Sequence, residues 1–233
     1  MYLDLEYNGV KGSGIQIYAR ERPSIPAARM RREEITIPGR SGTLYQSDGG
    51  YEPTEIEVDF NYIGPEDKWW KRWRKAQEWL SSTNSILRFS DDDGYFYWIS
   101  YVDVDENERP SIRVGKFTAT FITRDGLHYL NSGLRAHAPG DIKWNPYMTA
   151  HPVYRIIGEG MCVLEVNGKR MTANVGQNLT IDTDRMVAYR EDGTLQNTAV
   201  TGDYEDLYIP QGDVQILVSA GFDLQVTPNW RCL

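Results

Sequence analysis

The stretch Glu55-Ile56-Glu57-Val58-Asp59-Phe60-Asn61-Tyr62 alternates acidic or polar residues with large apolar ones. Because neighbouring side chains of a β-strand point to opposite faces, this alternation predicts a strand with one buried and one solvated face, as in antiparallel sheets. Lys116–Phe121 alternates in the same way. Between these segments, Ile86–Phe89 and Tyr95–Ile99 flank a turn of three aspartates and a glycine, which predicts a hairpin. The first half of the chain is therefore expected to be mainly β.

One helix is expected directly after the alternating strand. Gly64-Pro65 ends that strand and places proline at a position suited to the first helical turn, where acidic residues follow. Apolar residues then recur at helical spacing and share one face: Trp69, Trp73, Ala76 and Leu80. This face is expected to pack on a sheet.

The same helix carries a cluster of basic residues, Lys68, Lys71, Arg72, Arg74 and Lys75. Long basic side chains ordinarily solvate the outer face of an amphipathic helix, and we prefer this interpretation. A patch that binds phosphate or lipid is the alternative.

The second half of the chain predicts a run of short strands. Asn131-Ser132-Gly133, Ala138-Pro139-Gly140 and Asn145-Pro146 have the composition of a linker. After them, Met161–Val166 and Lys169–Ala173 flank Asn167-Gly168, a pair suited to a tight hairpin turn. Further strands are expected at spacings typical of a β-sandwich: Val153–Ile157, Leu179–Ile181, Met186–Tyr189, Gln215–Val218 and Phe222–Val226. We divide the chain near residue 139, into domains 1–138 and 139–233.

The composition excludes several classes of protein. The 233 residues include 25 Lys and Arg against 33 Asp and Glu, a net charge of −8 that disfavours general binding of nucleic acid or anionic membranes. No stretch approaches the roughly 18 apolar residues of a membrane span, and the acidic N-terminus is unlike a signal peptide. Synthesis in a cytoplasm is therefore expected. Cys162 and Cys232 are expected to be buried thiols, with a bridge between them as the alternative.

The common catalytic motifs are absent from the sequence: it has no G-x-S-x-G, no Walker loop and no H-E-x-x-H. Gly12-Ser13-Gly14 lacks the third glycine of a dinucleotide site and is interpreted as a turn. The acidic run before Gly94 fails as a calcium loop, because Phe89 and Ser100 would occupy its first and last positions. His128, His137 and His151 lie in or beside the linker. The sequence therefore predicts no enzyme and no catalytic, cofactor-binding or metal-binding residues.

A series of short motifs in the first half points to a known family. Arg22-Pro23-Ser24-Ile25-Pro26 leads through a basic stretch to Pro38-Gly39-Arg40-Ser41-Gly42, then to Gly49-Gly50-Tyr51-Glu52 and the acid-alternating strand. In this order the motifs resemble the N-terminal half of the distal tail proteins (Dit) of long-tailed bacteriophages, the siphophages. In the second half, Val166-Asn167-Gly168-Lys169 and Val226–Arg231 look like the family's galectin-like C-terminal domain.

The resemblance implies a fold and a function. The fold class would be mainly β, with an N-terminal β-sandwich ring ("belt") domain that carries one helix and a C-terminal galectin-like β-sandwich. The protein would be a structural part of the virion tail tip or baseplate, assembled in the host cytoplasm as a homo-hexameric ring. Its partners would be the tail tube protein, the tail-tip hub or tail-associated lysin, and receptor-binding or baseplate proteins. DNA would pass the channel without specific binding, and no cofactor or membrane is implied.

The resemblance to this family also suggests a subunit interface. Arg40, between two glycines, is expected either to bond the carboxylate of Glu55 or Asp59 in a neighbouring subunit or to bond its own chain. The candidate interface residues are Pro38, Gly39, Arg40, Gly42, Asp48, Gly49, Tyr51, Glu55 and Asp59.

Two other functions stay open at this stage. The C-terminal domain is the alternative candidate for a carbohydrate-binding module that contacts host cell-wall glycans, with Tyr204 and Trp230 as conceivable platforms. Trp230 has core packing as its competing interpretation. A wall hydrolase has no motif to support it.

Overall fold

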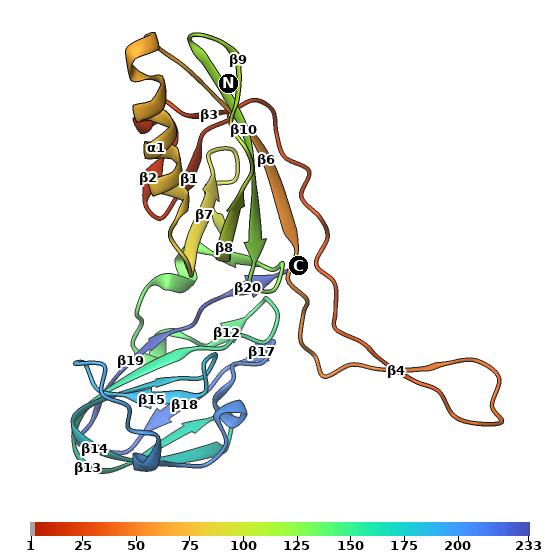
Figure 1. The fold of residues 1–233 in the computed structure, drawn as a ribbon. Helices are drawn as coiled ribbons and strands as arrows, with labels where there is room; N and C mark the ends of the chain where they lie inside the picture. The colour runs from red at the N-terminus through yellow and green to blue at the C-terminus, as the bar shows by residue number, and fades with distance from the viewer. Residues whose placement is uncertain (1–2) are drawn as a thin grey trace. The chain divides into compact units, whose positions relative to one another are not determined.

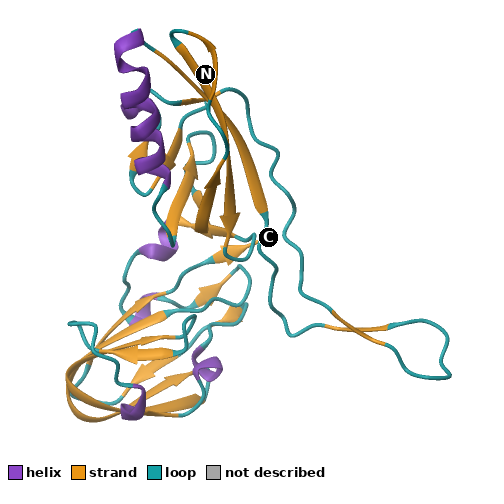
Figure 2. Cartoon of the chain, in the orientation of Figure 1, coloured by secondary structure: helices purple, strands orange, loops and turns teal. Residues whose placement is uncertain are grey.

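The computed structural model describes residues 3–233, which form two compact units. The first unit ends at His128 and also includes Leu233; the second spans Tyr129–Cys232. The division near residue 139 that we expected from the sequence falls inside the second unit. Both units are built mainly of strands, and the expectation of a mainly β protein is confirmed (Figure 2).

The described part of the first unit contains a large antiparallel sheet, a separate two-stranded sheet of β4 and β5, and one α-helix (Figure 1). The strands of the sheet follow the order β2-β1-β7-β8-β10-β6-β3, and β9 pairs with β10. The elements of this unit are β1 (Leu5–Tyr7), β2 (Val10–Lys11), η1 (Ser13–Ile15), β3 (Tyr18–Ala19), β4 (Glu33–Ile35), β5 (Leu44–Gln46), β6 (Glu55–Ile63), η2 (Glu66–Lys68), α1 (Trp69–Leu80), β7 (Ser85–Phe89), β8 (Tyr95–Val104), β9 (Glu108–Ser111) and β10 (Val114–Thr123).

Strand β6 has the two faces that its sequence predicts. Ile56, Val58, Phe60 and Tyr62 are at most 1% exposed, whereas Glu55 and Glu57 are exposed. The strand pairs with β10 without interruption from Glu55, opposite Ile122, to Ile63, opposite Val114. Phe60 faces Phe117 across the pair, and their rings stack at 5.2 Å between centroids. The alternation therefore becomes one apolar face in the core and one acidic face outside it.

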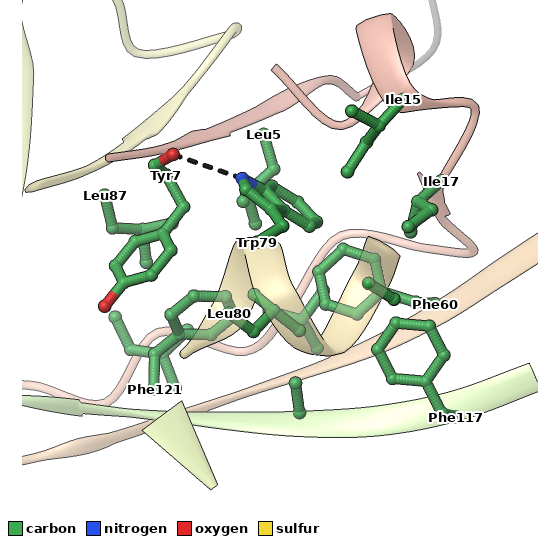
Figure 3. Close-up of a cluster of buried hydrophobic side chains, with 14 of the residues drawn as sticks. Leu5, Tyr7, Ile15, Ile17, Phe60, Trp79, Leu80, Leu87, Phe117 and Phe121 are labelled. Atoms are coloured by element: carbon green, nitrogen blue, oxygen red, sulfur yellow. Dashed lines mark hydrogen bonds between the residues drawn. The ribbon is translucent and has the colours of Figure 1, made fainter. Parts of the chain in front are cut away.

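Helix α1 covers the apolar face of the sheet and follows Pro65, as expected. The predicted apolar face is buried at Trp69, Ala76 and Leu80. Trp79, which the spacing did not identify, is also buried and packs edge-on against Phe60 at 5.8 Å (Figure 3). Its indole N–H donates to the carbonyl oxygens of Tyr7 and Val10, each at 3.1 Å. The helix is thereby fixed to the β1–β2 edge of the sheet as well as to its central strands.

The second unit has a sheet with the strand order β15-β14-β13-β18, to which β16 and β19 add, and a separate pair of β12 with β17. Its elements, of which β11 begins at the last residue of the first unit, are β11 (His128–Leu130), η3 (Asn131–Leu134), η4 (Pro139–Asp141), β12 (Trp144–Asn145), β13 (Val153–Val166), β14 (Lys169–Asp182), β15 (Val187–Tyr189), η5 (Asn197–Ala199), β16 (Val200–Thr201), η6 (Tyr204–Leu207), β17 (Gly212–Asp213), β18 (Ile216–Val218), β19 (Asp223–Thr227) and β20 (Arg231–Cys232).

Strands β13 and β14 form one long hairpin around Asn167-Gly168. The turn is confirmed, but the four short strands expected here are two strands of 14 residues each. The expected strands left a gap between Ile157 and Met161, yet the pairing continues through Gly158 and Gly160. A Cβ at Gly158 would lie 2.4 Å from Cδ1 of Phe222, so this glycine makes room for an aromatic ring. Cys162 is buried on the same strand as a free thiol, and burial raises its pKa.

Replacing Trp79 by phenylalanine tests the attachment of the helix. Trp79→Phe keeps a buried ring but leaves two carbonyl oxygens without the indole donor. We expect a loss of about 1–3 kcal/mol in the free energy of unfolding, measured by urea denaturation with circular dichroism. Trp70→Phe is the matched control on the same helix, where the side chain is 57% exposed and little change is expected. Equal stabilities of the two variants would contradict the assigned role of the indole N–H.

Candidate subunit interface

Residues 22–53 form an arm that leaves the sheet after β3 and returns to it at β6 (Figure 1). No residue from Tyr18 to Pro53 is buried. Within the arm, β4 pairs with β5, and Met30 forms a bridge with Tyr51 nearer the sheet. The arm is thus a two-stranded ribbon that lacks a core of its own.

The returning strand of the arm carries a bulge. Met30 lies opposite Tyr51 and Glu33 opposite Gln46, so two residues on one strand face four on the other. Gly49 adopts φ = +81° within the bulge, a conformation that favours glycine.

Asp48 organises this bulge. Its carboxylate accepts a 2.9 Å hydrogen bond from the Gly50 N–H and forms a 3.1 Å ion pair with Arg31. The Gly50 N–H, followed by the Arg31 charge, lowers the pKa of Asp48. Asp48 and Gly49 therefore shape the arm from within.

Arg40 lies at the tip of the arm, in the turn that connects β4 to β5. Gly39 and Gly42 adopt φ values of +81° and +85°, and the Arg40 N–H donates to the Ile37 carbonyl at 3.1 Å. The Arg40 side chain is exposed and forms no ion pair or hydrogen bond with any residue in the range 3–233. Its guanidinium is therefore open to another molecule.

Both ends of the arm are fastened to the sheet. On the outgoing side, Arg20 forms a 3.5 Å ion pair with Asp59, and Arg22 forms an ion pair with Asp91. On the returning side, Thr54 and Thr123 exchange backbone and hydroxyl hydrogen bonds in a buried network. The direction in which the arm leaves and re-enters the sheet is consequently set by its own unit.

The two acidic residues suggested for Arg40 differ in availability. Asp59 is half-buried, accepts a 2.7 Å hydrogen bond from the Thr118 hydroxyl and pairs with Arg20. Glu55 is exposed and has no side-chain partner within residues 3–233. A groove of about 450 Å³ lies between segment 21–26 and the acidic side chains of β6. Of the two carboxylates, Glu55 is thus the one without a partner in its own chain among residues 3–233.

The structure separates the candidate interface residues into two groups. Glu55 and Asp59 lie on β6, and the other candidates lie on the arm: Pro38, Gly39, Arg40, Gly42, Asp48, Gly49 and Tyr51. No hydrogen bond or ion pair joins the two groups within the described part of the chain.

Apolar residues of the arm were missed by the sequence analysis. Met30, Ile37, Leu44 and Tyr45 are between 40% and 57% exposed. Ile35 faces Leu44 across the two strands. The sequence did contain a signal for them. A segment rich in proline and glycine is not expected to form a core of its own, so its large apolar residues could have been predicted to stay exposed.

The histidines and other polar residues serve local structure. His151 contacts Asp184 at 3.1 Å and Arg231 at 2.7 Å and stacks on Tyr208. His128 shares a hydrogen bond with the Tyr97 hydroxyl. Among residues 3–233, no three or more His, Cys, Asp or Glu side chains are grouped to hold a metal ion. None of the helices in this range has the length and apolar character needed to span a membrane.

The two suggested glycan platforms of the second unit pack inward. Tyr204 and Trp230 are partly buried and contact its hydrophobic core. Trp144, by contrast, is 58% exposed. Glycan binding by this unit stays a prediction, but neither Tyr204 nor Trp230 provides an exposed aromatic ring for it.

The architecture defines a class: two mainly β units, with a single α-helix and an unpacked arm in the first. No family model matches the sequence, and no curated protein sequence matches it. Among solved structures, the chain is similar to the Dit protein of SPP1, with a TM-score of 0.70, 16% identity and coverage of 100% of both chains. That protein is described as a paradigm of the hub adsorption apparatus in phages that infect Gram-positive bacteria. The resemblance inferred from the sequence is confirmed at the level of the fold.

His128 gives the first unit a pH dependence. Burial lowers the pKa of His128 from 6.5, and the charge of Asp92 opposes this shift. The unfolded chain therefore binds the proton more readily, so stability is lost as the pH falls below about 6.5. We expect the urea midpoint to fall between about pH 7 and pH 5.5 by more in the wild type than in His128→Gln. Parallel pH profiles of the two proteins would show that His128 makes no such contribution.

Proposed function

We propose that this chain is a structural protein of a phage tail tip, where it forms a homo-hexameric ring between the tail tube and the host-adsorption apparatus. The full-length similarity to a hub adsorption protein supports this role. The observation that carries it is the arm, in which no residue from Tyr18 to Pro53 is buried. In this proposal the protein is found at the virion tail tip after assembly in the host cytoplasm.

The arm needs a partner for physical reasons. An isolated two-stranded hairpin is marginally stable in water, because it buries too little apolar surface. Both strands of the arm also have a free edge, which invites pairing with another chain. A ring satisfies both needs, since each subunit offers its arm to one neighbour and a different surface to the other.

Arg40 is the proposed contact at the tip of the arm. Its guanidinium would form a charge-assisted hydrogen bond with Glu55 of the neighbouring copy. Glu57, exposed on the same face of β6, adds a second acceptor, whereas Asp59 already serves Arg20 and Thr118.

The division of labour between the units is part of the same proposal. The first unit would form the ring, and the second, galectin-like unit would face receptor-binding or baseplate proteins. The tail tube and the tail-tip hub or lysin would meet the ring along its axis. An acidic channel would let DNA pass, because like charges do not hold phosphates.

Native mass spectrometry with negative-stain imaging tests the ring. Six chains of 26.7 kDa give an expected mass of about 160 kDa. Arg40→Ala is expected to raise the concentration needed for assembly about tenfold, the effect of losing one charge-assisted bond per contact. Arg185→Ala is the matched control, because Arg185 lies in the second unit with its side chain 70% exposed. A wild type that stays monomeric at every concentration, or rings indifferent to Arg40→Ala, would contradict the proposal.

Limited trypsin digestion tests where the arm goes. In the monomer we expect rapid cleavage after Arg29, Arg31, Arg32 and Arg40, because these residues are exposed. In the assembled ring the same sites should be protected several-fold, while cleavage after exposed residues of the second unit continues. Mass spectrometry of the fragments identifies the sites. An arm that is cut equally fast in both states would exclude it from the contact.

A further inference from the structure

One end of the first unit exposes three large apolar side chains. Ile63 is 65% exposed, Trp70 is 57% exposed and Ile112 is 58% exposed. They come from the last residue of β6, the first turn of α1 and the turn between β9 and β10. These three places lie at the same end of the unit (Figure 1).

Trp69 and its neighbours hold two of these elements together. The indole N–H of Trp69 donates to the Val114 carbonyl at 3.1 Å, which joins the helix to β10. Val114 is the residue that pairs with Ile63. The ring of Trp69 also meets that of Trp70 edge-on, at 4.8 Å between centroids. The start of α1 and the end of β6 are therefore held together through β10.

Arg109 connects the third element. Its guanidinium lies 4.8 Å from the centre of the Trp69 ring and donates to the Ile112 carbonyl at 2.9 Å. The Gly64 N–H donates to the Arg113 carbonyl at 2.9 Å, which joins the end of β6 to the same turn. The three elements that carry the exposed apolar side chains are thus held together at this end of the unit by contacts of their own. We name these residues the end patch: Ile63, Trp70 and Ile112, with the basic residues Arg74, Arg109 and Arg113 of the same segments.

The end patch is basic in an acidic protein. Segments 63–75 and 108–114 contain seven basic and three acidic residues, a local charge of +4 in a chain of net charge −8. None of the seven basic side chains forms an ion pair with a residue in the range 3–233. Other basic side chains do have acidic partners, as Arg155 has Glu191 at 2.7 Å and Arg31 has Asp48 at 3.1 Å. The unpaired charges favour an acidic partner.

We propose that the end patch docks an acidic surface of a different protein. Exposed apolar side chains with Trp and Arg have the composition of the centre of a protein interface. Two copies that met through this patch would bring like charges together, which disfavours a symmetric contact. This inference rests on the proposed function, in which the end of a ring meets a different protein of the tail.

A small anion fits the end patch less well. Arg72 donates to the Ile63 carbonyl and to Gln16, and Arg109 donates to the Ile112 carbonyl. A phosphate site needs donors that converge on one point, and these guanidinium groups are committed elsewhere. The exposed apolar residues favour instead a partner surface that combines acidic residues with an apolar one.

Selection from a random peptide library on the full-length protein tests the end patch. We expect the selected peptides to combine acidic and large apolar residues. For a synthetic peptide from this selection, Trp70→Ala and Arg74→Glu should each raise the Kd at least about tenfold, the loss typical of a residue at the centre of an interface. Added salt should weaken binding to the wild type. Trp144→Ala is the matched control, because Trp144 is 58% exposed in the second unit; this variant should bind like the wild type.

Several outcomes would overturn the inference. They are a selection without binders or without acidic enrichment, an equal loss in Trp144→Ala, and a change of oligomeric state in Trp70→Ala. Binding of inorganic phosphate or of vesicles with anionic lipid that Arg74→Glu abolishes would assign the patch to another ligand. Imaging separates this inference from the proposed function. Rings of Trp70→Ala without peptide binding support the patch, whereas a wild type without rings contradicts only the proposed function.

Discussion

The uninterrupted pairing of β6 with β10 is the constraint on which the rest of the first unit depends. Nine consecutive residues of β6 pair with β10. A shift of this register by one residue would turn the acidic side chains of β6 into the core. The same strand separates the two surfaces that matter for assembly. The arm re-enters the sheet at Thr54, one residue before β6, and the end patch begins at Ile63, its last residue.

This arrangement lets a rigid sheet present a segment that does not fold against it. Thr54 and Thr123 hold the returning end of the arm through buried, neutral hydrogen bonds, while Arg20 and Arg22 hold the outgoing end through ion pairs. Ordering an exposed segment costs conformational entropy, and the arm recovers little of it within its own chain. Fixed ends reduce that cost before any partner arrives, which is the advantage of preorganisation in binding.

The sequence predicted the elements whose periodicity is local and missed what depends on contacts between distant segments. The alternation of β6 and the helical spacing after Pro65 identified a strand and a helix at their observed positions. Spacing alone did not distinguish buried Trp79 from exposed Trp70, because the strands that cover one of them are distant in sequence. The expected gap between the strands Val153–Ile157 and Met161–Val166 was wrong for the same reason, because the glycine at position 158 makes room for the ring of Phe222, which is distant in sequence. In the candidate interface, the motifs suggested Arg40 and Glu55. Only the structure shows that Asp59 already pairs with Arg20 and accepts a hydrogen bond from Thr118.

The distribution of unpaired positive charge connects these observations. Copies of a protein with a net charge of −8 repel one another, so close association needs local compensation. Some basic residues of each unit pair with an acid of the same unit, as Arg20 does with Asp59 and Arg155 with Glu191. In the first unit, Arg40 at the tip of the arm and Arg74 beside Trp70 have no acidic partner in residues 3–233. Each stands among exposed apolar residues, and the coincidence of unpaired charge with unburied apolar surface is what a contact with another acidic molecule requires.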